Sequence, residues 1–282
     1  MNTSRQPKRI VITGATAGIG LECAKQLAPG NHLVLVGRSA DKLAVARDQV
    51  LAAGAESADT EICDFASLDA VRQLASNIAR NYDHIDVLIN NAGGVFANRT
   101  ETKDGFESTF AVNHLAPYLL TELLKPLMIA SAPSRIVITA STGHYRGTLD
   151  FDDLQYKQGY GIMKAYGRSK LANVIYAREL ARELAGTGVT VTALHPGAVA
   201  TDIWSGAPML LRPVLAVVKR LVMISPAEGG SAITHLASSP EVEGVTGEYF
   251  EKNKVRQPAR LALDADASQR LLSESARMVG LS

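Results

Sequence analysis

Short runs of apolar, mostly β-branched residues alternate along this chain with longer stretches whose apolar residues recur at helical spacing. Most runs are continuously apolar, which is typical of strands buried on both faces of a sheet. This alternation predicts an α/β fold: one doubly wound, mainly parallel sheet of about seven strands with helices on both faces. The expected strands cover 10–13, 33–36, 59–62, 87–89, 135–139, 189–194 and, more weakly, 246–250. The expected helices cover 20–27, 41–53, 68–81, 106–128, 165–184 and 227–237.

The sequence shows no sign of a boundary between domains. Its 282 residues include no internal repeat, no low-complexity segment and no linker rich in proline and glycine. We therefore expect a single domain over 1–282, with a last helix over about 264–279. Residues 208–224 are apolar but are interrupted by basic residues and prolines. We expect a flap over a lipophilic substrate site at about 203–225, with peripheral contact to a membrane surface as the alternative.

Charge and cysteine content exclude several classes of function. The 29 basic and 28 acidic residues leave no basic excess that would indicate a nucleic-acid partner. Two cysteines, Cys23 and Cys63, are too few for a disulfide framework or a cysteine-based zinc site. The first residues lack the apolar core of a signal peptide, and no apolar run is long enough to span a membrane. We therefore expect a cytoplasmic protein without an integral membrane segment.

A glycine-rich turn joins the first expected strand to the first expected helix. Residues 13–20 read Thr-Gly-Ala-Thr-Ala-Gly-Ile-Gly. Glycine is needed where the backbone bends sharply and approaches a pyrophosphate, and the N-terminus of the following helix attracts the phosphates. A plain tight turn is the alternative, but the order strand, turn and helix predicts a Rossmann-type dinucleotide site. The expected cofactor contacts in this turn are Gly14, Thr16, Ala17, Gly18, Ile19 and Gly20.

The end of the second expected strand indicates which dinucleotide binds. In NAD-binding proteins an acidic residue at this place binds the 2′-hydroxyl of the ribose. Here the strand ends in Gly37-Arg38-Ser39, with no acidic residue at its tip. The Arg38 guanidinium is suited to pair with a 2′-phosphate, which favours NADP(H). The alternative is that Arg38 is a solvated surface residue.

A tyrosine and a lysine stand four residues apart near the start of a strongly helical stretch. Tyr166 and Lys170 would share one face of that helix. An ammonium group near a phenol lowers the phenol pKa and fits it for proton transfer to or from a substrate oxygen. Tyr160 and Lys164 have the same spacing, but glycines flank Tyr160 and indicate a loop, so we assign them no role.

Further short motifs follow in a fixed order along the chain. With the glycine turn and the Tyr166–Lys170 pair, they make the chain resemble the short-chain dehydrogenase/reductase superfamily over roughly residues 8–250. Within it, the chain is similar to the retinol dehydrogenase-like group. The superfamily motifs are Asp64, Asn90–Gly93, Asn113, Ser141 and Pro196–Gly197. The segments shared with the retinol dehydrogenase-like group are Val112–Leu115, Ser169–Asn173 and Pro240–Gly247.

The resemblance implies roles for four residues. Tyr166 would be the general acid–base group, and Lys170 would lower its pKa and hold the nicotinamide ribose. Ser141 would donate a hydrogen bond to the substrate oxygen. Asn113 would hold a water that relays the proton toward solvent. The alternative hydroxyls near Ser141 are those of Thr139 and Thr142.

The resemblance also implies the remaining cofactor contacts, which follow three of the expected strands. Residues after the third strand would bind adenine. Those after the fourth would line the adenosine side, and those after the sixth would position the nicotinamide. In that order they are Asp64 and Phe65, then Asn90, Ala92 and Gly93, then Pro196, Gly197, Val199 and Thr201.

The sequence therefore predicts an NADP(H)-dependent oxidoreductase. It would transfer hydride between the cofactor and a lipophilic alcohol/carbonyl pair, such as a retinoid-, steroid- or polyketide-like ketone or aldehyde. Residues 147–163 add an aromatic-rich stretch that would form a wall of the substrate site. The alternative is a catalytically idle NADP-binding sensor or partner protein, which would be expected to have lost the tyrosine, lysine or serine.

Two further expectations concern partners and metals. A homodimer would pair the helices at 106–128 and 165–184 across a two-fold axis, as the resemblance implies. His114, His144 and His195 lie near site motifs but lack a second ligand at metal spacing. We therefore expect these histidines to be core residues or supports of the site, and we expect no metal.

Overall fold

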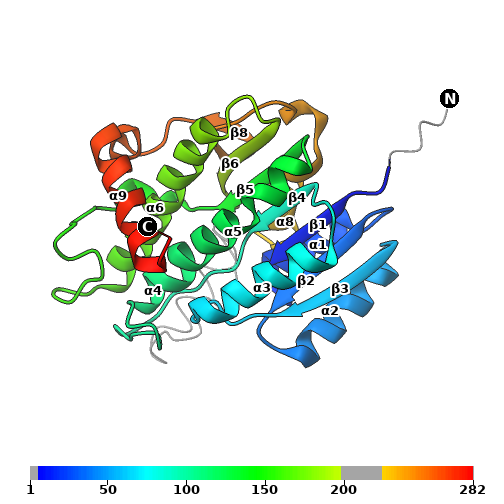
Figure 1. The fold of residues 1–282 in the computed structure, drawn as a ribbon, viewed down its shortest axis with the longest axis horizontal. Helices are drawn as coiled ribbons and strands as arrows, with labels where there is room; N and C mark the ends of the chain where they lie inside the picture. Colours follow the sequence, from blue (N-terminus) through cyan, green and yellow to red (C-terminus); the bar gives the residue numbers. More distant parts are fainter. Residues whose placement is uncertain (1–5, 198–223, 282) are drawn as a thin grey trace.

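The computed structural model describes residues 6–197 and 224–281, and their strands form one sheet (Figure 1). The strand order is β3-β2-β1-β4-β5-β6-β7-β8, in which β1 to β7 are parallel and β8 is antiparallel to β7. This confirms the doubly wound α/β fold. The strands are β1 Arg9–Thr13, β2 His32–Gly37, β3 Ser57–Ile62, β4 Val87–Asn90, β5 Ser134–Thr139, β6 Val189–His195, β7 Tyr249–Glu251 and β8 Lys254–Arg256.

Helices cover both faces of the sheet (Figure 1). α1, α2 and α8 pack on one face, whereas α3, α5 and α6 pack on the other and α9 lies outside α5 and α6. Within the described residues, none of the helices combines the length and hydropathy that a membrane span requires. The α-helices are α1 Gly18–Leu27, α2 Ala40–Ala52, α3 Leu68–Asn81, α4 Ser108–Phe110, α5 Ala116–Ala130, α6 Ile162–Glu183, α8 Pro226–Ser238 and α9 Ala265–Val279. The shorter helical turns are η1 Ala111–Leu115, η2 Thr142–Arg146, η5 Pro240–Val242 and η6 Arg260–Leu263.

The continuous apolar runs arise because two separate cores flank the sheet. In β1, Ile10 and Ile12 enter the core under α1, α2 and α8, while Val11 enters the core under α3, α5 and α6. Successive side chains of a strand point to opposite faces, so a strand covered on both faces needs apolar residues at every position.

The structure corrects two element predictions. The sheet has an eighth strand in the described chain, β8, because Lys252 and Asn253 turn the chain with φ of 51° and 57° and pair it back on β7. Two adjacent positive φ values suit a tight hairpin turn. The helix predicted over 106–128 is in fact three pieces, α4, η1 and α5, and η1 is a π-helical turn at Ala111–Leu115. Such turns widen a helix locally and are frequent at functional sites.

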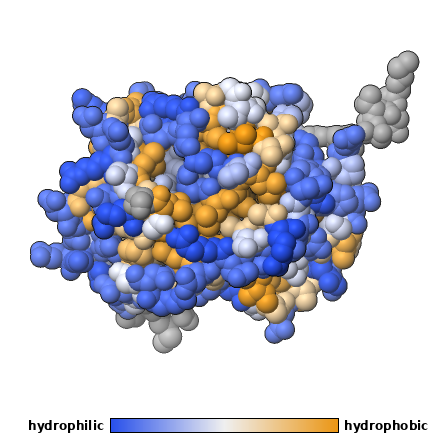
Figure 2. Space-filling model, viewed as in Figure 1, coloured by the Kyte–Doolittle hydropathy of each residue, from blue (hydrophilic) through white to orange (hydrophobic). Residues whose placement is uncertain are grey.

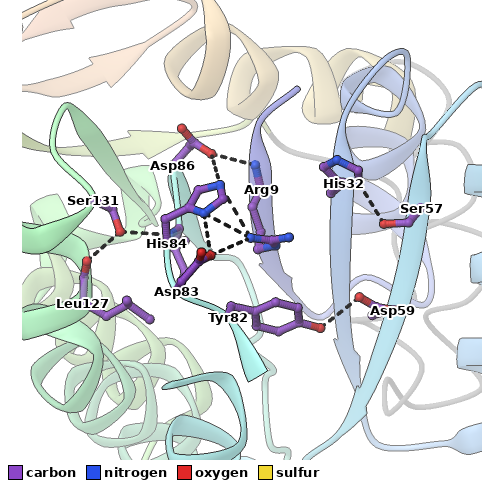
Figure 3. A network of polar contacts seen from close by, with 11 residues as sticks. Arg9, His32, Ser57, Asp59, Tyr82, Asp83, His84, Asp86, Leu127 and Ser131 are labelled. Carbon is purple, nitrogen blue, oxygen red and sulfur yellow. Dashed lines mark hydrogen bonds and ion pairs between the residues drawn. The ribbon is translucent and has the colours of Figure 1, made fainter. Parts of the chain in front are cut away.

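A polar network closes the amino end of the sheet (Figure 3). The Asp86 carboxylate accepts a hydrogen bond from the backbone N–H of Arg9 at 2.7 Å, and the Arg9 guanidinium lies 3.4 Å from Asp83 Oδ1. The Tyr82 hydroxyl donates to Asp59 at 3.0 Å. These residues stand at the end of the strands opposite to the motif residues, so Tyr82 is remote from the candidate site.

Candidate active site

The motif residues meet at the carboxyl ends of the central strands. The glycine turn follows β1, the Asn90–Gly93 motif ends β4 and continues beyond it, Ser141 follows β5, and Pro196 follows β6. The sheet order reverses between β1 and β4, which lie side by side. Ligands of doubly wound sheets bind outside the carboxyl ends of the strands at such a switch point.

The glycine turn has the conformation that close approach of a ligand requires. Gly14 and Gly18 have φ of 69° and 56°, a region that side chains other than glycine rarely adopt. At Gly20 a Cβ atom would lie 2.2 Å from the Gly14 carbonyl oxygen and 2.5 Å from Asn91 Nδ2. The turn therefore excludes a side chain at Gly20 and brings α1 directly against it.

The N-terminus of α1 is suited to bind an anion. Its N-cap residue, Ala17, makes no side-chain hydrogen bond to the helix, and the first helical turn carries no acidic residue. The first N–H groups of a helix lack partners within the helix and carry the positive end of its dipole. This end of α1 therefore fits the phosphates of a dinucleotide.

A pocket with basic side chains lies beside the glycine turn. Thr16, Arg38, Ser39 and Lys42 line a pocket of about 340 Å³. Within the described part of the chain, neither Arg38 nor Lys42 forms an ion pair. Two cationic side chains and two hydroxyl side chains therefore line one small space, a composition that suits a phosphate group.

Asn90 at the end of β4 and Asn91 after it have different roles. The buried Asn90 amide donates to Thr121 Oγ1 at 2.8 Å, so the Asn90 side chain is directed to α5 and its backbone is the part left to face a cofactor. Asn91 Nδ2 donates to the Thr13 carbonyl oxygen at 3.0 Å and thereby braces the glycine turn. The sequence alone assigns Asn91 no role, because it does not show which backbone atom a side chain reaches. Beyond Ala92, a Cβ at Gly93 would lie 3.6 Å from Lys170 Nζ.

After β3, the two predicted adenine contacts differ in exposure. The exposed Asp64 accepts the Ala66 N–H at 3.0 Å, which shapes the turn and leaves the carboxylate at the surface. Phe65 is buried in the core on the α3 side of the sheet. The Phe65 side chain is therefore a packing residue, and only Asp64 presents a polar side chain there.

Lys170 and Tyr166 share one face of α6, as predicted. Lys170 Nζ lies 5.7 Å from the centroid of the Tyr166 ring and donates to the Thr139 carbonyl oxygen at 3.0 Å. Burial lowers the pKa of Lys170 to about 8. The hydroxyl of Thr139 is buried and has no hydrogen-bond partner in the described structure. A buried unpartnered hydroxyl next to this lysine is a feature that a bound polar ligand would satisfy.

Ser141 stands against the Tyr166 ring. It begins η2, and its Oγ accepts the Gly143 N–H at 3.1 Å. A Cβ at Gly143 would lie 3.3 Å from Tyr166 Cε1 and 3.5 Å from Ser141 Oγ, so glycine leaves room for the two hydroxyls to approach. Thr142 belongs to the exposed start of η2 and is no substitute for Ser141.

The pKa of Tyr166 departs from our expectation. Burial raises it above 10.0, and hydrogen bonding with Ser141 opposes that rise. Lys170 does not lower it here, because the ammonium group points to Thr139 and burial penalises the phenolate more. A phenol with a raised pKa is a proton donor at neutral pH.

Asn113 lies within η1, the π-helical turn. Its Oδ1 accepts the Gly94 N–H at 2.7 Å, and its Nδ2 donates to the Gly94 carbonyl oxygen at 2.9 Å and to Ser169 Oγ at 3.1 Å. The side chain thus joins the loop after β4 to α6, next to Lys170. Both donor hydrogens of its amide bind protein groups, and a water relay through Asn113 stays a prediction.

A family model described as short chain dehydrogenase matches residues 8–208. The chain belongs to the short-chain dehydrogenase family. Retinol dehydrogenase 14 of Mus musculus is 39% identical over 97% of this chain and 86% of its own length. Polyprenol dehydrogenase of Mus musculus is 37% identical over 98% of this chain and 85% of its own length.

A solved structure has the same fold over nearly the whole chain. An uncharacterized protein from Mycobacterium paratuberculosis matches with a TM-score of 0.78 and 27% identity, covering 98% of this chain and 96% of that one. The similar proteins thus include a retinol dehydrogenase and a polyprenol dehydrogenase. As a member of the short-chain dehydrogenase family, the chain is an oxidoreductase of alcohol and carbonyl groups that uses a nicotinamide dinucleotide.

The end of β6 is described only in part. Gly197 has φ of 106°, and a Cβ there would lie 2.2 Å from Ile224 Cδ1, so glycine is required for this contact. Val199, Thr201 and the expected flap, up to residue 223, lie outside the described residues. Pro196 and Gly197 follow β6 beside the other strand ends.

In this short-chain dehydrogenase, residues 147–163 are held in place by contacts with two arginines outside the stretch. The Arg168 guanidinium stacks 3.6 Å from the centroid of the buried Tyr156 ring and donates to the Asp153 carbonyl oxygen. Phe151 lies 4.4 Å beneath the guanidinium carbon of Arg270 in α9. Tyr156 and Phe151 therefore pack against protein groups, which fixes the stretch to α6 and α9.

The three histidines near the site are buried or partly buried. Within the described residues, no three His, Cys, Asp or Glu side chains converge as metal ligands. His114 has Nδ1 3.2 Å from Asn173 Oδ1 and Nε2 2.9 Å from Ser275 Oγ, and it joins η1 to α6 and α9.

We expect the free energy of unfolding to decrease as the pH is lowered, because the buried ring of His114 is held neutral. Burial lowers its pKa from 6.5 to about 4. The unfolded chain therefore binds a proton first as pH falls below 6.5, and stability is lost between that pH and about 4. The free energy of unfolding at pH 5 should be about 2 kcal/mol lower than at pH 7.5 through this group alone. Urea titrations of wild type and His114→Gln at both pH values measure this difference. In the variant, the free energy of unfolding should lack this part of its dependence on pH. His84→Gln, at an exposed histidine, is the control; equal slopes in wild type and His114→Gln would contradict the assignment.

Proposed function

We propose that this chain is an NADP(H)-dependent oxidoreductase that interconverts a lipophilic alcohol and its carbonyl compound. The observation that carries the proposal is the meeting of Tyr166, Lys170 and Ser141 beside a glycine turn with an uncapped helix N-terminus. The bound dinucleotide supplies or accepts the hydride. The protein then has to bind it, orient the substrate oxygen and move one proton.

The proton step is assigned to Tyr166. In carbonyl reduction its hydroxyl donates the proton to the substrate oxygen, and in alcohol oxidation it accepts that proton. Burial raises its pKa, so the hydroxyl carries its proton at neutral pH. Ser141 Oγ accepts from Gly143, so its own hydrogen is left to donate to the same substrate oxygen. Lys170, buried and next to Gly93, would hold the nicotinamide ribose.

Preference for NADP(H) rests on the pocket formed by Thr16, Arg38, Ser39 and Lys42. Hydrogen bonds to charged groups contribute roughly 1.5–3 kcal/mol. We therefore expect Arg38→Leu to lower kcat/KM for NADPH by about 10–100-fold and to change that for NADH little. Steady-state kinetics with both cofactors measure it. Arg47→Leu, at a half-exposed arginine within α2, should keep the wild-type preference. A wild-type preference for NADH would contradict this use of Arg38.

The substrate class follows from the similarity to enzymes named for retinol and polyprenol, both lipophilic alcohols. The test is cofactor oxidation at 340 nm with retinal, a steroid ketone, a quinone and a small aromatic aldehyde. Faster turnover of the lipophilic carbonyls supports the proposal. Tight NADPH binding with no turnover of any compound would favour the idle sensor instead.

We also propose a homodimer through α5 and α6. On the face drawn in Figure 2, hydrophobic residues gather over the middle of the molecule, where Figure 1 shows α5. A shallow pocket between α3 and α5 is lined partly by Ala75, Ala79 and Leu123. α9 contacts both α5 and α6, so a partner on this face would meet α9 as well. Light scattering of the purified chain distinguishes dimer from monomer.

A further inference from the structure

His144 lies next to the catalytic machinery without a role in the mechanism above. It is completely buried and belongs to η2, the turn that Ser141 begins. The His144 ring lies 4.0 Å from that of Tyr145 and 4.5 Å from that of Tyr249, measured between ring centroids. A buried imidazole packed between aromatic rings has to satisfy both nitrogens with protein groups.

The hydrogen bonds of His144 define its tautomer. Nε2 lies 3.1 Å from the backbone nitrogen of Ala259, which is an N–H donor, so Nε2 accepts. The proton of a neutral ring is then on Nδ1, which lies 2.6 Å from the Ser141 carbonyl oxygen and donates to it. Burial lowers the pKa of His144 and so favours this neutral form.

A second contact joins the same turn to the same segment. The Tyr145 hydroxyl donates to the Gln257 carbonyl oxygen at 3.0 Å. Two neighbouring residues of η2 therefore hold the chain that follows β8, and His144 connects that chain to Ser141. The backbone of Ser141 is thus held by a segment that is distant from it in sequence.

We propose that neutral His144 is a positioning residue that holds the Ser141 hydroxyl in its donor orientation toward Tyr166 and the substrate oxygen. The inference rests on the proposed function. Ser141 Oγ accepts from Gly143 only while the turn from Ser141 to His144 keeps its shape. The Ser141 carbonyl oxygen closes that turn by accepting from the His144 backbone N–H at 3.0 Å and from His144 Nδ1. Loss of the Nδ1 hydrogen bond leaves the turn closed by the backbone alone, and we expect the Ser141 hydroxyl then to be held less firmly.

Two amide substitutions separate the two hydrogen bonds of His144. The amide nitrogen of His144→Asn takes the place of Nδ1 and keeps the donor to Ser141. The amide oxygen of His144→Gln takes the place of Nε2 and keeps the acceptor for Ala259. Each variant loses one buried hydrogen bond, so a merely structural role predicts similar losses of activity in both.

The experiment is steady-state reduction of the best carbonyl substrate with NADPH over a range of pH. Loss of an oxyanion donor lowers kcat by about 10²–10³-fold, and we expect displacement of Ser141 to cost part of that, about 10–100-fold, in His144→Gln. Its KM should stay within about threefold, and His144→Asn should retain most of the wild-type kcat. The pKa of Tyr166 read from the pH profile should rise in His144→Gln only, because the Ser141 hydrogen bond lowers that pKa.

A double-mutant cycle with Ser141→Ala completes the test. If His144 acts through Ser141, adding His144→Gln to Ser141→Ala should lower kcat little further. Equal losses of kcat in both His144 variants, or a full additional loss in the Ser141→Ala background, would overturn the inference while leaving the proposed function intact. A wild-type chain that reduces no carbonyl would instead overturn the proposed function, and the inference with it.

Discussion

Tyr166→Phe is expected to lower kcat for carbonyl reduction by about 10²–10⁴-fold, the usual contribution of a general acid. The substitution removes one oxygen and keeps the ring that packs beside Gly143. The glycine turn and the Arg38 pocket are untouched, so the Kd for NADPH should change less than about threefold. Stopped-flow single turnovers and fluorescence titration with NADPH measure the two quantities separately.

The matched control is Tyr82→Phe, which removes a tyrosine hydroxyl at the opposite end of the sheet (Figure 3). It loses its hydrogen bond to Asp59 and should keep the wild-type kcat. A Tyr166→Phe enzyme with a kcat near that of wild type would show that another group delivers the proton.

The second large effect concerns the glycine turn. Gly20→Ala should raise the Kd for NADPH by about 10–100-fold, since overpacking of a closed site costs roughly 1–3 kcal/mol. The new methyl group would meet the Gly14 carbonyl oxygen at 2.2 Å and Asn91 Nδ2 at 2.5 Å. The Gly14 carbonyl oxygen belongs to the turn that would hold the phosphates and cannot move without opening that turn, and Asn91 braces the same turn.

Gly161→Ala is the control for this substitution. At Gly161 the added Cβ would be 3.5 Å from its nearest neighbour, an ordinary contact, and φ is −150°. Its NADPH affinity should equal that of wild type. Unchanged affinity in a folded Gly20→Ala protein would place the dinucleotide elsewhere.

Most of the fold could be predicted from hydrophobic patterning. The parallel strands are buried on both faces, so residues such as Ile10, Val11 and Ile12 form continuous apolar runs that mark them. β8 could not be found in this way, because Lys254, Val255 and Arg256 are all exposed on an edge strand. The π-helical turn was equally invisible, since it changes backbone hydrogen bonds and leaves the apolar spacing of the segment largely as it was.

The site was predictable where residue type and spacing carry the chemistry. Tyr166 and Lys170 could be named as a pair from their helical spacing, whereas the role of Ser141 came from the resemblance to the short-chain dehydrogenases. The contact of Asn91 and that of His144 could not be predicted, because each reaches a backbone atom distant in sequence, of Thr13 and Ala259 respectively. His144 could be named only as a core residue or a support of the site. The prediction that the pKa of Tyr166 is lowered was wrong for a related reason. Burial raises this pKa, and burial is a property of the packed structure.

The most direct test of the account is transfer of deuterium from NADPH labelled at C4 of the nicotinamide to retinal or another lipophilic carbonyl. The two labelled faces are used in separate reactions, and the product alcohol is analysed by mass spectrometry. We predict that one label, and not the other, appears on the carbinol carbon, and that Tyr166→Phe lowers the rate of product formation by about 10²–10⁴-fold. NADPH bound tightly, with no label in any product across the carbonyl panel, would contradict the assignment of this chain as a carbonyl-reducing enzyme.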